Sequence, residues 1–195
     1  LEAYTTSPVP SMERHIEKAQ LADALGFKAL WIRDVPFNVP TFGDAGQTFD
    51  PYVYLGFLAA HTKNIALVTG SLILPLRHPA HVAKAAASVD QLSGGRFLMG
   101  VASGDRPEEY PAMNVDFDQR GQRFADAYDY IRKMADDFAS FANPHGNPAY
   151  MDMLPKPTAG RIPMLITGGS RQPPDWVASH GAGWITYPRS APQQA

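Results

Sequence analysis

The segment Ile65–Asp105 constrains the fold most, because it holds two apolar runs with an amphipathic stretch between them. The runs, Ile65–Leu74 and Arg96–Ala102, are too continuously apolar for half-exposed strands and are typical of strands buried on both faces. The stretch between them opens at His78-Pro79, repeats apolar residues at helical spacing and ends at Gly94-Gly95. Strand, helix and strand in succession predict a βαβ unit with a right-handed crossover.

Strands and helices are predicted to alternate along the rest of the chain. Further strands are expected at Phe27–Ile32, Pro163–Thr167 and Trp184–Tyr187. The total of five strands favours an α/β protein with a parallel sheet, either an open doubly wound sheet or a (β/α)8 barrel. Helices are expected over 11–25, from Asp50, over 119–138 and around 175–178, and the segments 35–47, 106–118 and 139–161 are expected to be loops.

Composition excludes several classes of protein. The 195 residues suit a single domain, residues 1–195, and the formal net charge of −2 without a basic run argues against a nucleic-acid partner. The chain has no cysteine, which removes disulfides, thiolate metal sites and cysteine nucleophiles. No apolar run is long enough to predict a membrane span, so the expected location is the cytoplasm.

The strongest local signal is the segment Ile166–Arg171, a strand that ends in two glycines, a serine and an arginine just before a helix. Glycines let backbone N–H groups approach an anion, and an arginine binds phosphate through two hydrogen bonds. Phosphate binding by Gly168, Gly169, Ser170 and Arg171 is one interpretation. A tight strand-to-helix turn with a capping serine is the other.

Other polar residues give weaker signals. A second predicted strand ends in small residues, at Ala102-Ser103-Gly104-Asp105. The sequence around Ser103 does not match the pattern of a nucleophile elbow. His78 and His81 have a spacing that two metal ligands on a helix would share, but a solvated helix start explains them better and no metal is predicted. Asp34 and Asp105 each follow a strand, where they would serve acid–base chemistry or cap the next turn. Arg120 and Arg123 open a helix and would pair with nearby carboxylates or reach a phosphate.

Taken together, the motifs resemble the bacterial luciferase-like flavin monooxygenase family, and within it a luciferase-type oxidoreductase subgroup. The segment from Asp90 through Arg96-Phe97 to Gly104 carries the most specific resemblance, and the likeness covers nearly the whole chain in the family's order. The other segments that carry it are Leu21–Phe27, Leu30-Trp31, Leu72–Pro75, His78-Pro79, Phe124, Leu154–Pro157 and Gly168–Ser170.

The resemblance implies a (β/α)8 TIM barrel. In that reading Glu2-Ala3-Tyr4 lies at the exit of the first barrel strand, and Trp184–Tyr187 is the sixth strand. The first strand and the last two strands would then be absent from this sequence, so the barrel is expected to be incomplete. Such a sheet would leave two parallel edges without partners.

The resemblance also implies a cofactor, FMN or alternatively the deazaflavin F420. Thr69 and Gly70 would lie against the ring system, and Ala102 and Ser103 would flank the ring or the ribityl chain. Gly168, Gly169, Ser170 and Arg171 would hold the phosphate, with Arg120 as a second cation. Many relatives carry a histidine after the second strand, where this chain has Arg33-Asp34, so Asp34 is the nearest substitute for a catalytic base.

The resulting hypothesis is an FMN-dependent oxidoreductase, a monooxygenase that uses reduced flavin and oxygen on a small organic substrate. The expected partners are that substrate, a flavin reductase and further copies of the chain in a homodimer or higher oligomer. One alternative is a non-catalytic flavin-binding or partner subunit of the same fold, and another is an F420-dependent hydride-transfer enzyme. A third alternative is a hydrolytic barrel that uses Asp34 and Asp105.

Overall fold

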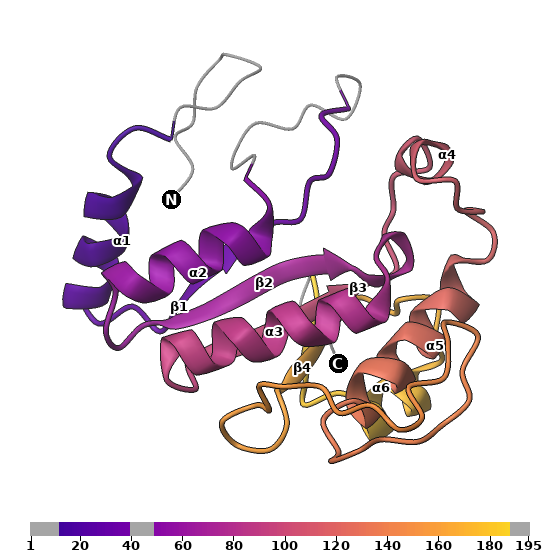
Figure 1. Ribbon diagram of the computed structural model, residues 1–195. Coiled ribbons are helices and arrows are strands. Elements are labelled where there is room, and N and C mark those ends of the chain that lie inside the picture. Colours follow the sequence, from indigo (N-terminus) through magenta and orange to yellow (C-terminus); the bar gives the residue numbers. More distant parts are fainter. Residues whose placement is uncertain (1–11, 40–48, 188–195) are drawn as a thin grey trace.

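The computed structural model describes residues 12–39 and 49–187 and contains one parallel sheet (Figure 1). Its five strands pair in the order β1-β2-β3-β4-β5, so each strand lies next to the one that precedes it in the chain. The five predicted strands are therefore confirmed. They are β1 (Ala29–Ile32), β2 (Ala66–Ile73), β3 (Phe97–Ala102), β4 (Met164–Thr167) and β5 (Gly183–Ile185).

The strand order decides between the two architectures that the sequence left open. A doubly wound sheet reverses its strand order at a switch point, whereas a (β/α)8 barrel adds each strand beside the previous one. The order here runs in one direction through all five strands. The described chain is thus an incomplete barrel, and the expected first-strand exit at residues 2–4 lies outside the described residues.

The helices mostly occupy the predicted segments. Asp50 caps α2 by accepting hydrogen bonds from the backbone N–H groups of Tyr52 and Val53, at 2.9 and 3.2 Å. Gly94, with φ of +66°, provides the left-handed cap that ends α3. The helical elements are α1 (His15–Ala24), α2 (Pro51–His61), the 3-10 turn η2 (Leu74–Leu76), α3 (Pro79–Ser93), α4 (Glu109–Ala112), α5 (Arg120–Lys133) and α6 (Pro174–His180).

Three helix predictions need correction. Helix α5 ends at Lys133 rather than Phe138, although the apolar residues that recur at helical spacing are all buried: Phe124, Ala127, Tyr128, Ile131 and Met134. The predicted loop 106–118 contains the short helix α4, which forms around the fully buried ring of Tyr110. The helix predicted over 11–25 begins only at His15, because Arg14 at its N-cap has a left-handed backbone with φ of 57°. Ser11, the predicted cap, lies outside the described residues.

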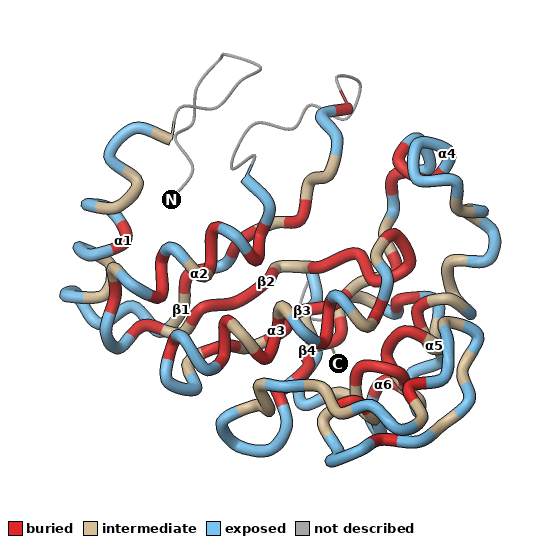
Figure 2. Tube along the Cα trace, in the orientation of Figure 1, coloured by how far each residue is buried: buried red, intermediate tan, exposed pale blue. Residues whose placement is uncertain are grey.

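The core lies between the sheet and the helices that cover it (Figure 2). Strand β4 alternates between buried residues, which join this core, and partly exposed ones such as Leu165. In β3 the three consecutive residues Met99–Val101 are all buried, and Leu98 is partly exposed. Leu21, Leu25 and Leu92, which helical spacing assigns to the apolar sides of their helices, are instead 59–70% exposed. Helical spacing indicated a continuous apolar side for α1 and α3 but did not reveal which residues another element covers.

Arg96 connects the ends of α2 and α3 at the edge of the sheet opposite the strand exits. Its guanidinium donates to the carbonyls of Ala59, Thr62, Ile65 and Ser93 and to the Thr62 hydroxyl, at 2.8–3.1 Å. These contacts use all five guanidinium N–H donors and satisfy carbonyls at the end of α2. Arg96 within the Gly94-Gly95-Arg96-Phe97 motif is therefore a structural residue.

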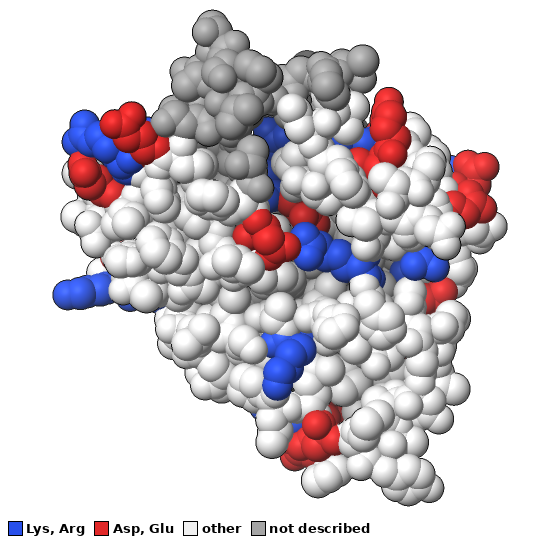
Figure 3. Space-filling view, turned by 45° about the horizontal axis from the view of Figure 1, so that its top comes forward, with Lys and Arg blue, Asp and Glu red and all other residues white. Residues whose placement is uncertain are grey.

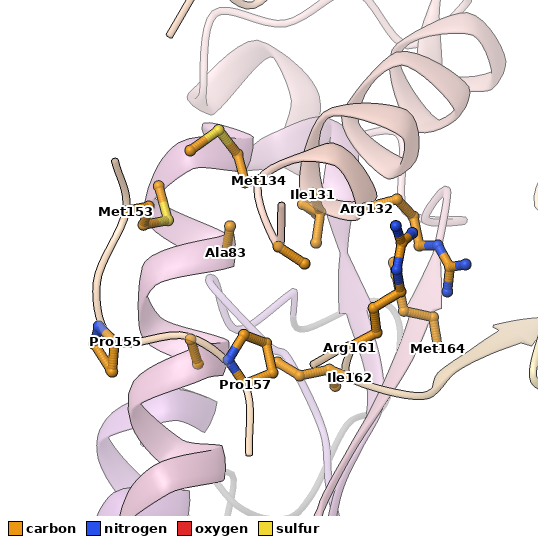
Figure 4. Close-up of a pocket in the computed structure, with 12 residues that line it drawn as sticks. Ala83, Ile131, Arg132, Met134, Met153, Pro155, Pro157, Arg161, Ile162 and Met164 are labelled. Atoms are coloured by element: carbon orange, nitrogen blue, oxygen red, sulfur yellow. The ribbon is translucent and has the colours of Figure 1, made fainter. Parts of the chain in front are cut away.

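A small cavity lies in the outer layer, where α3 and α5 meet the segment that precedes β4 (Figure 4). Its volume is about 30 Å³, and apolar side chains including Ala83, Ile131, Met134 and Ile162 surround it. That volume has room for about two water molecules and none for a cofactor. Within the described ranges no helix combines the length and the apolarity that crossing a bilayer requires.

Candidate functional site

A large cleft opens where the strands end at their carboxyl termini. Its volume is about 990 Å³, and residues at the exits of all five strands contribute to its wall. Figure 3 shows Lys and Arg side chains gathered across the middle of a hollowed face of the molecule. The lining includes four arginines, Arg33, Arg106, Arg120 and Arg171. A cleft of this size at the carboxyl edge of a parallel sheet is the usual place for a small-molecule site.

Small residues form part of the cleft wall in its central region. Gly70 of β2 and Ala102 of β3 both line the cleft. Trp31 and Ile185 line it from the outer strands β1 and β5. A side chain at Gly70 would lie only 2.8 Å from the Trp31 ring, so glycine is required there. This small-residue surface, which we call the floor, leaves room for a flat ring between the larger side chains.

The structure corrects the position of the hydroxyl that β2 brings to the cleft. Thr69 is fully buried, and its hydroxyl donates to the Gly100 carbonyl at 2.8 Å, so it does not line the cleft. The pairing of β2 with β3 shifts register between Thr69 and Leu72. This bulge lets the consecutive residues Gly70 and Ser71 both line the cleft. Ser71 is thus a site residue that a regular strand pattern could not indicate.

The glycine turn after β4 lines the cleft with all four of its predicted residues, Gly168–Arg171. Ser170 and Arg171 have positive φ angles of 44° and 61°, as does Gly168 at 54°. Within the part of the chain that the structure describes, the backbone N–H groups of Gly169 and Arg171 make no hydrogen bond. Unbonded N–H groups in a turn that contains left-handed residues can donate to an anion. The Ser170 hydroxyl donates to the Thr167 carbonyl at 2.8 Å and so also serves the turn.

Helix α5 brings a second cation to the glycine turn. Arg120 lines the cleft, with its guanidinium carbon 3.6 Å from the centre of the Phe117 ring and its Nη1 donating to the Phe117 carbonyl at 2.7 Å. The next residue, Gly121, packs so tightly on Arg171 that a side chain there would lie 2.9 Å from it. Gln172 donates to the Gly121 carbonyl at 2.8 Å and completes the contact.

The exit of β3 is held by Tyr110 of α4. The Tyr110 hydroxyl donates to the Ser103 carbonyl, and burial raises the pKa of that phenol to about 12. Gly104, with φ of +76°, leaves space for the ring, since a side chain there would lie 2.7 Å from the Tyr110 oxygen. Ala102 and Ser103 line the cleft as expected, but Ser103 is only 7% exposed and does not present a free nucleophile.

Asp34 lines the cleft but is engaged in an ion pair. Its carboxylate, 1% exposed, accepts hydrogen bonds from Arg77 Nε and Nη2 at 3.1 and 2.7 Å and from the Ile73 N–H at 3.1 Å. Arg77 also donates to Asp50 at 3.0 Å. Burial opposes the charge on Arg77, but these two carboxylates outweigh it and raise the pKa of the guanidinium. These contacts give Asp34 a structural role, whereas Asp105 lines the cleft with an exposed side chain.

His78 and His81 do not form a metal site. His78 accepts a hydrogen bond from the Ala80 N–H at 3.3 Å, which caps α3. Its ring lies 6.0 Å from His81 and 6.0 Å from His145, measured between centroids. Among residues 12–39 and 49–187, no group of three or more His, Cys, Asp or Glu side chains is placed to hold a metal ion.

Comparison with known proteins gives a consistent result. The profile of a family described as luciferase-like monooxygenase matches residues 2–195. The chain is 31% identical over 127 residues to the 4-hydroxyprotoasukamycin monooxygenase of Streptomyces nodosus subsp. asukaensis. That match covers 65% of this chain and 33% of the relative.

Two solved structures share the fold. An F420-dependent secondary alcohol dehydrogenase in complex with an F420-acetone adduct has a TM-score of 0.76 and 22% identity, over 95% of this chain and 55% of that one. The oxygenating constituent of 3,6-diketocamphane monooxygenase from Pseudomonas putida, in complex with FMN, has a TM-score of 0.65 and 20% identity. The latter match covers 78% of this chain and 44% of that one. The chain thus spans between a third and about half of the length of these three proteins.

Proposed function

Because this chain belongs to the luciferase-like monooxygenase family, we propose that it is a flavin-dependent monooxygenase that binds FMN in the cleft at the strand exits. The observation that carries the proposal is the glycine turn Gly168–Arg171, which lines the same cleft as the small-residue floor. A phosphate and a flat ring are the two parts of FMN that such a cleft must accommodate. The predicted binding residues other than Thr69 all line the cleft.

The phosphate of FMN fits the cationic end of the cleft. The unbonded N–H groups of Gly169 and Arg171 would donate to its oxygens, and Arg120 and Arg171 would balance its charge. Arg120 is already held by Phe117, so little side-chain freedom would be lost on binding. The ring would lie against Gly70 and Ala102, beside Trp31.

Reduced flavin supplies the reactivity towards oxygen in such an enzyme, and the protein binds, orients and shields it. The ion pair of Asp34 leaves Asp105 as the exposed carboxylate among the described residues that line the cleft. We therefore propose that Asp105, rather than Asp34, contacts the small organic substrate. A flavin reductase would supply the reduced cofactor.

F420 is the second candidate cofactor. Its support is the F420-dependent dehydrogenase, which covers 95% of this chain and has the higher TM-score of the two structures described above. F420 also carries a phosphate and a flat ring, so the same cleft residues would bind it. A non-catalytic subunit of the same fold would bind flavin without turnover. The hydrolytic alternative is weakened by the ion pair that engages Asp34.

Cofactor titration of the full-length protein tests the proposal. FMN is expected to bind more tightly than riboflavin, which lacks the phosphate. Arg171→Gln and Arg120→Gln each remove one cation and should weaken FMN binding about ten-fold, as expected for a charged hydrogen bond, without weakening riboflavin binding. Arg161→Gln is the control, because Arg161 pairs with Asp136 outside the cleft.

The outcomes separate the candidates. Preference for F420 over FMN would replace oxygen chemistry with hydride transfer. Equal affinity for FMN and riboflavin would contradict the phosphate site. Failure of the wild-type protein to bind FMN, riboflavin or F420 would overturn the proposed function.

A further inference from the structure

Two hydroxyl groups from strands that are not neighbours meet in the floor of the cleft. Ser71 Oγ of β2 and Thr167 Oγ1 of β4 form a hydrogen bond with each other, and either can be the donor. Both residues line the cleft and are partly buried. The phosphate site proposed above uses neither side chain.

This contact requires a specific backbone arrangement. Strands two positions apart in a sheet lie roughly 9–10 Å from each other, which is too far for two short hydroxyl side chains to meet across a flat sheet. The bulge at Gly70–Ser71 turns Ser71 towards the cleft, and the sheet curves as part of a barrel. The intervening strand β3 carries Ala102 at its exit, which leaves the space between the hydroxyls open.

The hydroxyl pair has one hydrogen-bond donor left for a ligand. Each hydroxyl has one hydrogen to donate, and the hydrogen bond within the pair uses one of the two. In the described part of the chain, the hydroxyl groups of Ser71 and Thr167 form no other hydrogen bond. One O–H therefore remains for a ligand in the cleft, and its partner hydroxyl strengthens it by polarisation.

The surroundings of the pair indicate the ligand group. The floor residues Gly70 and Ala102, which line the cleft with the pair, carry no charge. Of the four arginines that line the cleft, Arg120 and Arg171 lie at α5 and the glycine turn, where an anion would bind, and Arg33 and Arg106 follow β1 and β3. A neutral acceptor, such as a carbonyl oxygen or a ring nitrogen of a heteroaromatic system, is the group that a single hydroxyl donor suits.

We propose, resting on the flavin-binding function proposed above, that the Ser71–Thr167 hydroxyl pair donates one hydrogen bond to an acceptor at the edge of the flavin ring. The pair positions the ring on the floor, independently of the phosphate site. Ser71 and Thr167 then act as one unit, because removing either hydroxyl breaks the arrangement that orients the other.

The test uses Ser71→Ala, Thr167→Val and their combination, with FMN and riboflavin as probes. Each single variant should weaken FMN and riboflavin binding equally, by about five-fold, and shift the absorption bands of the bound flavin. The double variant should be little weaker than either single variant, because the pair acts as a unit. Thr167→Ser keeps a hydroxyl and should restore binding. Ser88→Ala, which removes a hydroxyl on α3 outside the cleft, is the control.

The results that would overturn this inference differ from those that would overturn the proposed function. If the wild-type protein binds FMN and riboflavin but the variants show unchanged affinities and spectra, the inference is wrong and the flavin site stands. A lower melting temperature with unchanged flavin binding would likewise overturn it and leave the pair a purely structural contact. If the wild-type protein binds neither flavin, both the inference and the proposed function fall.

Discussion

Asp23 fastens the segment that leads into β2. Its carboxylate accepts hydrogen bonds from the backbone N–H groups of Lys63, Asn64 and Ile65, at 2.6, 3.0 and 2.8 Å. The bond from Lys63 contributes most to lowering the pKa of this carboxyl, and those from Ile65 and Asn64 add to it. A side chain near the end of α1 thus sets the start of a central strand.

This contact predicts a pH dependence of stability. A carboxyl whose pKa is lower in the folded state stabilises the protein above its unfolded pKa of about 3.9, and the contribution is lost as the pH falls through the folded pKa. Urea unfolding of Asp23→Asn at pH 7 and pH 3 should show a smaller loss of unfolding free energy on acidification than the wild type. Asp118→Asn, which alters an exposed carboxylate, should behave like the wild type. An identical pH dependence in all three proteins would contradict the role of Asp23.

Individual site residues were predictable where strand position alone decided them. The glycine turn and Ala102 line the cleft because they follow or end strands, and the sequence shows where strands end. Ser71 lines the cleft where Thr69 was expected, because the bulge adds one residue to the strand spacing and has no signal in the sequence. The structural role of Asp34 could not be predicted, because its partner Arg77 lies 43 positions along the chain and no local pattern shows their ion pair.

Among the elements, the exit of β1, the end of β2 and the start of α2 are joined by one group of charges. Arg77 pairs with Asp34 after β1 and with the α2 cap Asp50, at 2.7 and 3.0 Å. Because Asp34 is almost fully buried, the pair also neutralises a charge that water cannot reach. This group of charges fixes two strand exits on the side of the cleft where Trp31 lies.

Removing one member of this charge group should destabilise the fold. Asp34→Asn leaves Arg77 without its best partner, and we expect a loss of about 2–3 kcal/mol of unfolding free energy, less than a fully buried pair because Arg77 is 26% exposed. Arg77→Met alone should cost a similar amount, and the double variant less than the sum. Denaturant unfolding of the four proteins measures the coupling. Full stability of Asp34→Asn with loss of activity would instead restore Asp34 as a catalytic candidate.

Local patterns in the sequence did not predict helix α4 or the end of α5. Helix α4 forms where Tyr110 reaches the Ser103 carbonyl and packs with Phe117, their ring centres 4.9 Å apart. The segment around it has two prolines, Pro107 and Pro111, and local patterns indicate a loop. The end of α5 at Lys133 was not predicted, because the buried Met134 continues the apolar side of the helix beyond its last residue.

For the whole molecule, the sequence pattern predicted the five strands and their alternation with helices, and the family resemblance predicted the barrel. The pattern could not predict which helical faces stay exposed. Leu21 and Leu25 lie one turn apart on α1, and Val53 and Phe57 one turn apart on α2, all 40–73% exposed. The two helices pack against each other, with the His15 ring stacked on Phe57. We expect the exposed apolar side chains of these two helices to form a surface of the kind that buries against a partner.

We expect this surface to support the predicted homodimer. Leu25→Glu combined with Val53→Glu places two charges on it and should convert a dimer into a monomer, as measured by light scattering after size-exclusion chromatography. Met151→Glu adds a charge at another exposed apolar residue and should leave the mass unchanged. A monomeric wild-type protein, or a variant that remains dimeric, would exclude this surface as the interface.

The strand order has a consequence for how the chain is made. Synthesis releases the polypeptide from its amino end, and each of β2 to β5 pairs with the strand released just before it. A newly made strand therefore finds its partner already outside the ribosome. The bulge emerges after β1 and before β3, and the glycine turn after β3 and before β5, so the cleft is assembled progressively, one strand exit at a time.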